Sequence, residues 1–346
     1  MRSSTPIPGA TKALRYLQSE RIPFILLTNG GGKSEEDRVN ELQDKLDVPL
    51  DTSMFVQSHT PFADMTDLHD KTVLVTGGDY DKCRAVAQGY GFKNVVMPGD
   101  IVSSYPEIWP FSHVFESYYS GFSKPLPAPI NPASPNKSLK IDAIFVYNDP
   151  RDWALDSQLI IDLLLSDSGI LGTLAASNGD ASLPNRGYQQ SSQPHLYFSN
   201  PDLWWAAKYH LPRLGQGGFR EAFEGLWAAV TNGAKLDKTV IGKPYHATYE
   251  FAERRLRAHR KVLLGQLGLN DPLRRVYMVG DNPESDIKGA MGYRSPFETQ
   301  WESVLVRTGV YQGGEPEAKP TIVLDDVQRA VEWAVEDSRK KSEGLN

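Results

Sequence analysis

The segment that most constrains the fold of this chain is an apolar run that ends in Gly-Asp. Residues 276–286 read VYMVGDNPESD, so that Asp281 follows the run and Asp286 comes five residues later. A short apolar run bounded by turn residues is typical of a buried strand, and open α/β sheets bind ligands where their strands end. Carboxylates there suit Mg²⁺, which binds through one or two carboxylates and substrate phosphate. The run therefore predicts Asp281 as a metal ligand, with a purely structural strand-Gly-Asp turn as the alternative. It leaves Asp286 open as a ligand through water, a partner for a lysine, or a helix cap.

A second apolar run leads into a glycine-rich loop. Phe24–Leu27 is followed by Thr28, Asn29 and three glycines, and Ser34 then opens a helix. A strand, a glycine-rich loop and a helix N-terminus together present backbone N–H groups to an anion. We therefore expect Thr28 and Asn29 to bind a phosphoryl group, with ordinary strand-end capping as the alternative.

A third apolar run, at residues 239–241, is followed by Gly-Lys-Pro. It predicts a short strand that carries Lys243 at its end, close to the start of a helix. A lysine ammonium in that place neutralises a phosphate as a point charge. The alternative is a surface lysine with no ligand.

These segments, in this order, resemble the haloacid dehalogenase superfamily of phosphohydrolases. The long gap between the first two resembles the class IIA members, which insert a large cap there. The stretches IPFILLTNGGGKSEEDRVNEL, FVQSHTPF, VGDNPESDIKGA and SVLVRTGVY resemble the cat-eye syndrome critical region protein 5-like branch. The resemblance runs from Pro6 to about Trp333. It implies an α/β fold, with a doubly wound parallel-sheet (Rossmann-like) core and an inserted α/β cap domain.

The resemblance also implies an activity and a set of residues. The activity is that of a Mg²⁺-dependent phosphatase acting on a small phosphorylated metabolite. The implied residues are Thr28, Asn29 and Lys243 for catalysis, Asp281 and Asp286 for the metal, Asn282 beside it, and Asn200 and Asp202 in a cap loop that reads the leaving group.

One part of the family pattern is missing from this sequence. The family opens with a strand that ends in Asp-x-Asp, whose first aspartate is the nucleophile. Here the chain begins MRSSTPIPGA, and its Pro-Gly-Ala resembles a segment that follows that strand. Asp79 and Asp81 form another Asp-x-Asp, but they come after the Thr-Asn loop and are interpreted as a turn and helix cap. We therefore expect no nucleophile in this chain and no activity as written, and we favour a truncated start over an evolved pseudoenzyme.

The composition limits the classes of binding partner that this protein can be expected to have. The net charge of −6 and the absence of a basic run argue against nucleic acid, and no apolar run is long enough to cross a bilayer. The single cysteine, Cys83, excludes an internal disulfide. The resemblance implies a mitochondrial location, with the cytoplasm left open because no targeting segment is visible, and a homodimer formed through the cap. Two other functions stay open: a non-catalytic protein that binds a phosphorylated ligand or acts as a scaffold, and a role in glycerophospholipid biosynthesis.

We expect the chain to alternate between two domains. The expected parts are residues 1–68 for the first part of the core, 69–210 for the cap, 211–336 for the second part of the core, and 337–346 for a charged tail.

Three features near the end of the cap have local interpretations. The GQGG stretch at residues 215–218 does not follow a strand, so we interpret it as a flexible loop rather than a dinucleotide site. The helix after it, Phe219 to Val230, is expected to bury Leu226 and Val230 on one face. Trp204 and Trp205 are expected either to line a substrate pocket or to be buried against neighbouring elements.

Overall fold

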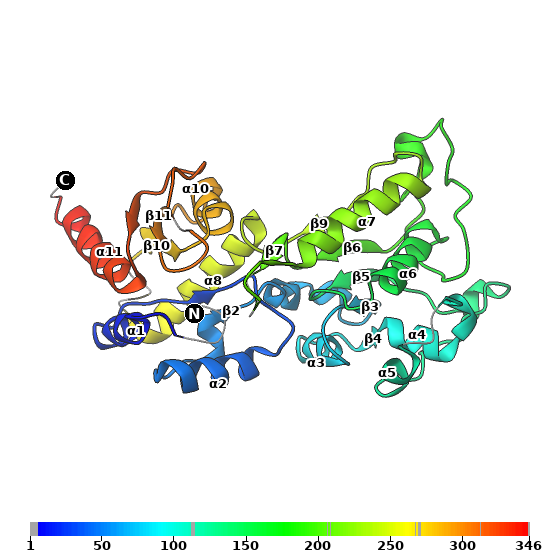
Figure 1. The fold of residues 1–346 in the computed structure, drawn as a ribbon, viewed down its shortest axis with the longest axis horizontal. Coiled ribbons are helices and arrows are strands. Elements are labelled where there is room, and N and C mark those ends of the chain that lie inside the picture. Colours follow the sequence, from blue (N-terminus) through cyan, green and yellow to red (C-terminus); the bar gives the residue numbers. More distant parts are fainter. Residues whose placement is uncertain are drawn as a thin grey trace. The chain divides into compact units, whose positions relative to one another are not determined.

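The computed structural model describes residues 6–344 except 112–114, 206, 208, 267, 269–270 and 312. The chain divides into two compact units, whose elements are labelled in Figure 1. Unit 1 comprises Met1–Asn29, Glu35–Ser58 and Ile241–Asn346, and unit 2 comprises Gly30–Ser34 and His59–Val240. Each unit is therefore assembled from stretches of chain that are far apart in the sequence.

Unit 1 is built from parallel strands with helices around them. Its strands form two sheets, one of β1 (Leu26–Leu27) and β2 (Phe55–Val56), the other of β10 (Arg275–Gly280), β11 (Gln300–Val306) and β12 (Ile322–Leu324) in that order. Its helical elements are α1 (Ala10–Ser19), α2 (Glu35–Leu46), the 3-10 turn η1 (Thr52–Met54), α8 (His246–Leu264), the π-helical turn η7 (Pro283–Ile287), α10 (Lys288–Gly292) and α11 (Val327–Ser342).

The strand predicted from the apolar run is confirmed as β10, which pairs with β11 along its whole length, from Arg275↔Gln300 to Gly280↔Leu305. Val304 and Val306 of β11 pack against Ala330 of α11. These contacts follow from the sequence, because strands covered by helices must be apolar on both faces.

The charged end of the chain is more ordered than expected. Helix α11 continues through Ser342, and Asp326 caps its start by accepting a bond from the Arg329 N–H at 2.9 Å. Asp337 accepts a hydrogen bond from the Tyr277 hydroxyl at 2.6 Å, and the Lys341 ammonium lies 3.2 Å from Glu302. Residues 337–342 of the predicted tail are thus the last part of a helix, residues 343–344 form a turn, and residues 345–346 lie outside the described residues.

Unit 2 contains a five-stranded parallel sheet and an antiparallel hairpin. The sheet has the order β4 (Asn94–Val96), β3 (Thr72–Thr76), β5 (Ala143–Val146), β6 (His195–Phe198) and β9 (Thr239–Val240), and the hairpin is β7 (Trp204–Trp205) with β8 (Arg213–Leu214). Its α-helices are α3 (Lys82–Gly89), α4 (Pro98–Ser104), α5 (Glu116–Ser120), α6 (Trp153–Leu165) and α7 (Gln216–Val230). Its 3-10 turns are η2 (Thr60–Asp64), η3 (Thr66–Leu68), η4 (Pro106–Ile108), η5 (Pro135–Lys137) and η6 (Pro184–Gly187).

The sheet of unit 2 is covered on both faces. Successive side chains of a strand point to opposite faces, so Ile144 of β5 joins the cluster formed with α6 and α7. Phe145, the next residue, instead contacts the rings of Phe62 and Phe92 on the other side. The Phe62 ring belongs to η2, and Phe92 follows α3. Unit 2 is therefore a helix–sheet–helix sandwich.

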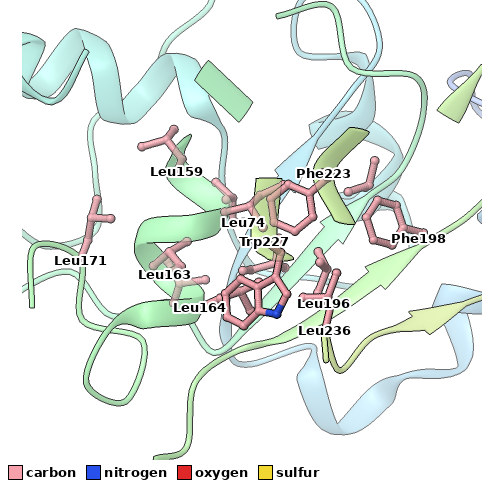
Figure 2. Close-up of a cluster of buried hydrophobic side chains, with 14 of the residues drawn as sticks. Leu74, Leu159, Leu163, Leu164, Leu171, Leu196, Phe198, Phe223, Trp227 and Leu236 are labelled. Carbon is pink, nitrogen blue, oxygen red and sulfur yellow. The ribbon is translucent and has the colours of Figure 1, made fainter. Parts of the chain in front are cut away.

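Helix α7 belongs to unit 2, which differs from the expected return to the core at residue 211. The helix buries Phe219, Phe223 and Trp227, spaced four residues apart, and Figure 2 shows Phe223 and Trp227 among leucines of the same cluster. The predicted buried face is wrong, because Leu226 and Val230 are 46% and 49% exposed. Large aromatic side chains bury more apolar area than the residues we had favoured.

Two other local predictions need correction. The strand before Lys243 is β9, which pairs with β6 in unit 2 rather than with a strand of unit 1. Gly215–Gly218 is buried, with Gly215 as the N-cap residue of α7, so it is not a flexible loop. No helix in the described part of the chain is long and apolar enough to span a membrane.

Candidate functional site

The Lys243 ammonium is a buried charge in unit 1. Its Nζ lies 2.6 Å from Asp286 Oδ1 and donates to the Leu27 carbonyl oxygen, at the end of β1, at 3.2 Å. The two charged side chains are 9% and 5% exposed. A buried ion pair needs such close geometry and further hydrogen bonds to offset its loss of hydration. Lys243 is therefore fixed in place between the end of β1 and the loop that follows β10.

Asn29 holds the backbone of Lys243 rather than its side chain. The Asn29 Nδ2 donates to the Lys243 carbonyl oxygen at 2.8 Å, and the Lys243 N–H donates to Asn29 Oδ1 at 2.7 Å. The two residues are 214 positions apart in the sequence and both are buried. This reciprocal pair joins two distant segments of unit 1. Thr28, the half-buried residue before it, donates its N–H to the Val56 carbonyl oxygen at 2.9 Å.

Asp286 is held on both of its oxygens. Oδ1 binds Lys243, and Oδ2 accepts the Asn282 N–H at 3.0 Å. A side chain at Gly280 would place its Cβ 2.2 Å from Asp286 Oδ2, so only glycine allows the carboxylate to approach the end of β10. The buried Tyr249 hydroxyl donates to the Ser285 carbonyl oxygen at 2.8 Å and fixes the same turn. Of the three interpretations left open for Asp286, the geometry matches a partner for a lysine.

Asp281 joins the loop after β10 to the loop after β11. Its Oδ2 accepts the Val310 N–H at 2.6 Å, and its carbonyl oxygen accepts the Tyr311 N–H at 3.0 Å. A Cβ at Gly309 would lie 1.8 Å from Asp281 Oδ2. The carboxylate therefore lies in a space that only a glycine leaves open.

Asn282 starts the helical turn η7. Its Oδ1 accepts hydrogen bonds from the N–H groups of Glu284 and Ser285 at 3.0 and 3.3 Å. N-cap residues commonly make such bonds. Its own N–H binds Asp286. Asn282 thus orients Asp286 through the backbone while its side chain starts the turn.

The remaining predicted residues lie in unit 2. Asn200 and Asp202 form a turn after β6, in which the Asp202 N–H donates to Asn200 Oδ1 at 2.8 Å. The glycine loop is also held there, because the Gly32 N–H donates to His59 Nε2 at 3.1 Å. The helix cap predicted for the Asp-x-Asp pair is wrong for Asp81, which makes no side-chain bond at the N-cap of α3.

Several residues at the site were missed by sequence reasoning. Tyr249, Gly280, Gly309 and Val310 contact the two aspartates, yet none belongs to a residue type that signals phosphate chemistry. Two of them had a readable signal, because a glycine in or near the end of a strand can mark a close approach of backbone to another group. Gly280 is the last residue of β10, and Gly309 follows the end of β11 by three residues.

Of the two aspartates expected to bind Mg²⁺, Asp281 fits a direct ligand better than Asp286. In the described part of the chain no three His, Cys, Asp or Glu side chains gather as a metal-binding group. Both oxygens of Asp286 accept bonds from the protein, so Asp281 is the carboxylate that fits direct coordination. A site with few protein ligands suits Mg²⁺, which keeps several waters and takes oxygens from a substrate phosphate.

Two family profiles match the sequence. One, described as haloacid dehalogenase-like hydrolase, matches residues 1–93, and one described as HAD-hydrolase-like matches residues 240–330. The intervening part of the chain is mostly unit 2.

Two curated proteins are similar over nearly the whole chain. One, named a mitochondrial hydrolase in Saccharomyces cerevisiae, is 39% identical over 352 residues, which cover 97% of this chain and 92% of that protein. The other, named a cardiolipin synthase (CMP-forming)/mitochondrial hydrolase fusion protein in Schizosaccharomyces pombe, is 39% identical over 97% of this chain. The chain spans about half of that fusion protein, 51% of its length.

Solved structures share the fold at low identity. A hypothetical protein from Pyrococcus horikoshii OT3 has a TM-score of 0.60 and 18% identity, covering 96% of this chain and 95% of its own. A p-nitrophenyl phosphatase from Archaeoglobus fulgidus has a TM-score of 0.57 and 16% identity, covering 95% and 93%. The likeness at these identities concerns the fold, in which helices flank parallel sheets.

Proposed function

Because the chain belongs to the haloacid dehalogenase-like hydrolase family, we propose that it hydrolyses the phosphate ester of a small metabolite. The observation that carries this proposal is the Lys243 ammonium, which is buried and held by Asp286 and Leu27. A fixed cation at strand ends neutralises a phosphoryl group without having to reorganise during the reaction. The similarity of the fold to that of a p-nitrophenyl phosphatase supports the same class of substrate.

The proposed roles follow from the contacts. Lys243 neutralises phosphoryl charge, and Asp286 and Asn29 keep its ammonium and its backbone in place. Thr28, at the end of β1, donates a hydrogen bond to a phosphoryl oxygen. Positioning and charge neutralisation carry most of the catalysis in phosphoryl transfer, and these roles supply both, while the nucleophile is a separate question.

Mg²⁺ belongs to the proposal as a cofactor. Asp281 would hold it, because one carboxylate oxygen is fixed by the Val310 N–H and the residue stands at the end of a buried strand. When bound, the ion would orient and neutralise phosphoryl oxygens. Asp286 would act through Lys243 and the Asn282 backbone rather than as a direct ligand.

The charge of Lys243 is tested by replacing it. In whichever chain of the nucleophile test described next is active, we expect Lys243→Met to lower kcat/KM for p-nitrophenyl phosphate and a panel of phosphorylated metabolites by about 100-fold or more, the usual loss when one preorganised donor is removed. Lys288→Met is the matched control, because that lysine is 53% exposed and pairs with the exposed Glu284. Equal activity in both variants would contradict the proposed role.

The nucleophile is tested separately, by assaying this chain beside one extended upstream to the next in-frame start. Activity in the extended chain alone would support the expected Asp-x-Asp strand. Activity in both would place the nucleophile within these residues. If neither chain hydrolyses phosphate esters although both are folded, the phosphatase proposal is wrong.

A binding protein that does not hydrolyse its ligand is the second candidate. One observation favours it: three of the four carboxylate oxygens of Asp281 and Asp286 already accept bonds from the protein. Calorimetric titration with inorganic phosphate, with and without Mg²⁺, tests it. Binding without turnover would support this candidate, and the absence of binding would exclude it.

We also propose a mitochondrial location and a link to glycerophospholipid synthesis. The names of both curated relatives support the location, and the fusion to a cardiolipin synthase in one of them supports the link. Fractionation of cells that express the tagged protein tests the first, and turnover of glycerol 3-phosphate or phosphatidylglycerol phosphate tests the second. A homodimer through unit 2 is proposed as well, and light scattering of the purified protein decides it.

A further inference from the structure

The buried turn Gly215–Gly218 at the start of α7 contacts the loop that carries Asn200 and Asp202, and the proposed function gives the turn no role. Both segments belong to unit 2. The loop leaves β6 at Ser199, and the turn precedes the aromatic residues that anchor α7 in the core of the unit.

The Gln216 side chain binds residues at the ends of two neighbouring strands, β5 and β6. Its Oε1 accepts the Asn200 N–H at 2.8 Å. Its Nε2 donates to Ser199 Oγ at 3.1 Å and to the Val146 carbonyl oxygen at 3.2 Å. The side chain is 1% exposed. A buried amide whose donor and acceptor are both used fixes the groups around it, since any shift leaves a polar atom without a partner.

The glycines on either side bring the backbone of the turn against the loop. The Gly215 N–H donates to the Leu203 carbonyl oxygen, and the Gly217 N–H to the Asp202 carbonyl oxygen, each at 2.9 Å. A Cβ at Gly217 would lie 2.3 Å from the Pro201 carbonyl oxygen. Neither glycine has a positive φ, so the backbone conformation alone does not require glycine. Glycine is required at these positions because a side chain would collide with the backbone of the loop.

We propose that Gly215–Gly218 is a rigid seat that sets the position of the loop 200–202, and that Gln216 is a positioning residue of this loop. The inference rests on the proposed function and on the expectation, implied by the family resemblance, that Asn200 and Asp202 read the leaving group. The seat holds the loop at both ends, through Asn200 and through Asp202. The selection among leaving groups therefore depends on Gly215–Gly218, although these residues do not contact the substrate themselves.

The first test replaces Gly217 by alanine and uses Gly225→Ala as the matched control. Gly225 lies on the same helix and is exposed, and a Cβ there would meet nothing within 4 Å. Hydrogen exchange of the backbone N–H groups of Asn200 and Asp202 is measured in the full chain. We expect exchange to become about tenfold faster or more in Gly217→Ala and to stay unchanged in the control. Equal protection in the two variants would overturn the seat.

The second test uses Gln216→Met, which keeps the size of the side chain and removes its three hydrogen bonds. The kcat/KM ratio between p-nitrophenyl phosphate and glycerol 3-phosphate is expected to move toward one, because a loosened loop discriminates less between leaving groups. The same fractional loss on both esters would indicate a structural role alone and overturn the positioning role.

The two tests also separate this inference from the proposed function. If the wild-type chain hydrolyses neither ester, the ratio is measured from the dissociation constants of the two esters by calorimetry. If it binds neither, the proposed function fails and the role in selection fails with it. The exchange measurement still decides whether the seat fixes the loop.

Discussion

Lys243→Met tests the buried ion pair through stability as well as activity. The substitution leaves the Asp286 carboxylate, 5% exposed, with the Asn282 N–H as its remaining hydrogen-bond partner in the described site. Removing one partner of a buried pair costs about 3–5 kcal/mol. With about 2–4 °C per kcal/mol for a unit of this size, the melting temperature of unit 1 should fall by about 6–20 °C.

A double-mutant cycle isolates the pair from the rest of the site. Asp286→Asn leaves a buried ammonium and should cost a similar amount as Lys243→Met. The double variant places two neutral side chains together and should lose less than the sum of the singles, by about 2 kcal/mol or more. Urea unfolding followed by circular dichroism gives the free energies of unfolding, and calorimetry gives the melting temperatures.

The exposed pair Lys288–Glu284 supplies the control, since its side chains are 53% and 61% exposed. Lys288→Met should change stability by less than about 1 kcal/mol. The reasoning is refuted if Lys243→Met behaves like this control, or if the two single losses simply add in the double variant.

Three further predictions concern Asp281, Glu253 and Asp156. Gly309→Ala would place a Cβ 1.8 Å from Asp281 Oδ2, so we expect a higher Mg²⁺ concentration at half-maximal activity; an unchanged titration would contradict the metal role. Burial raises the pKa of Glu253, but hydrogen bonds to its carboxylate outweigh burial and hold the pKa below its usual 4.5. The resulting stability is present above pH 4.5 and lost as pH falls, and Glu253→Gln should flatten this acid limb of the unfolding curve. Burial raises the pKa of Asp156 to about 7, so the folded protein loses stability as pH rises from about 4 to 7. Asp156→Asn should recover on the order of a few kcal/mol at pH 8 and nothing below pH 4, as measured by urea unfolding at both values.

The parts of the site that could be predicted are those written as contiguous patterns. The apolar run before Gly280 identified β10, because a fully buried parallel strand must be apolar on both faces. The same pattern placed Asp281 at the end of that strand. The contact between Lys243 and Asp286 was one of three interpretations, and the sequence could not choose among them because the residues are 43 positions apart.

The parts that could not be predicted depend on which surface a segment packs against. Helix α7 offered two candidate faces, and the face with Phe219 and Trp227 is buried because the cluster of unit 2 accepts large rings. Strand β9 has two residues, Thr239 and Val240, too few to show which sheet they join. The two bonds between the Asn29 side-chain amide and the Lys243 backbone join residues 214 positions apart, and a backbone partner leaves no trace in the side-chain pattern.

The interleaving of the two units has a consequence for biosynthesis. A ribosome makes a chain from its N-terminus, and domains fold as their residues emerge. Every segment of unit 2 has been made by Val240, whereas β10, β11 and β12 of unit 1 come afterwards. Unit 2 can therefore fold on the nascent chain before Lys243, the partner of Asn29, has been synthesised. The site is completed only after most of the protein has been synthesised, so unit 2 can emerge from the ribosome and fold before the site exists.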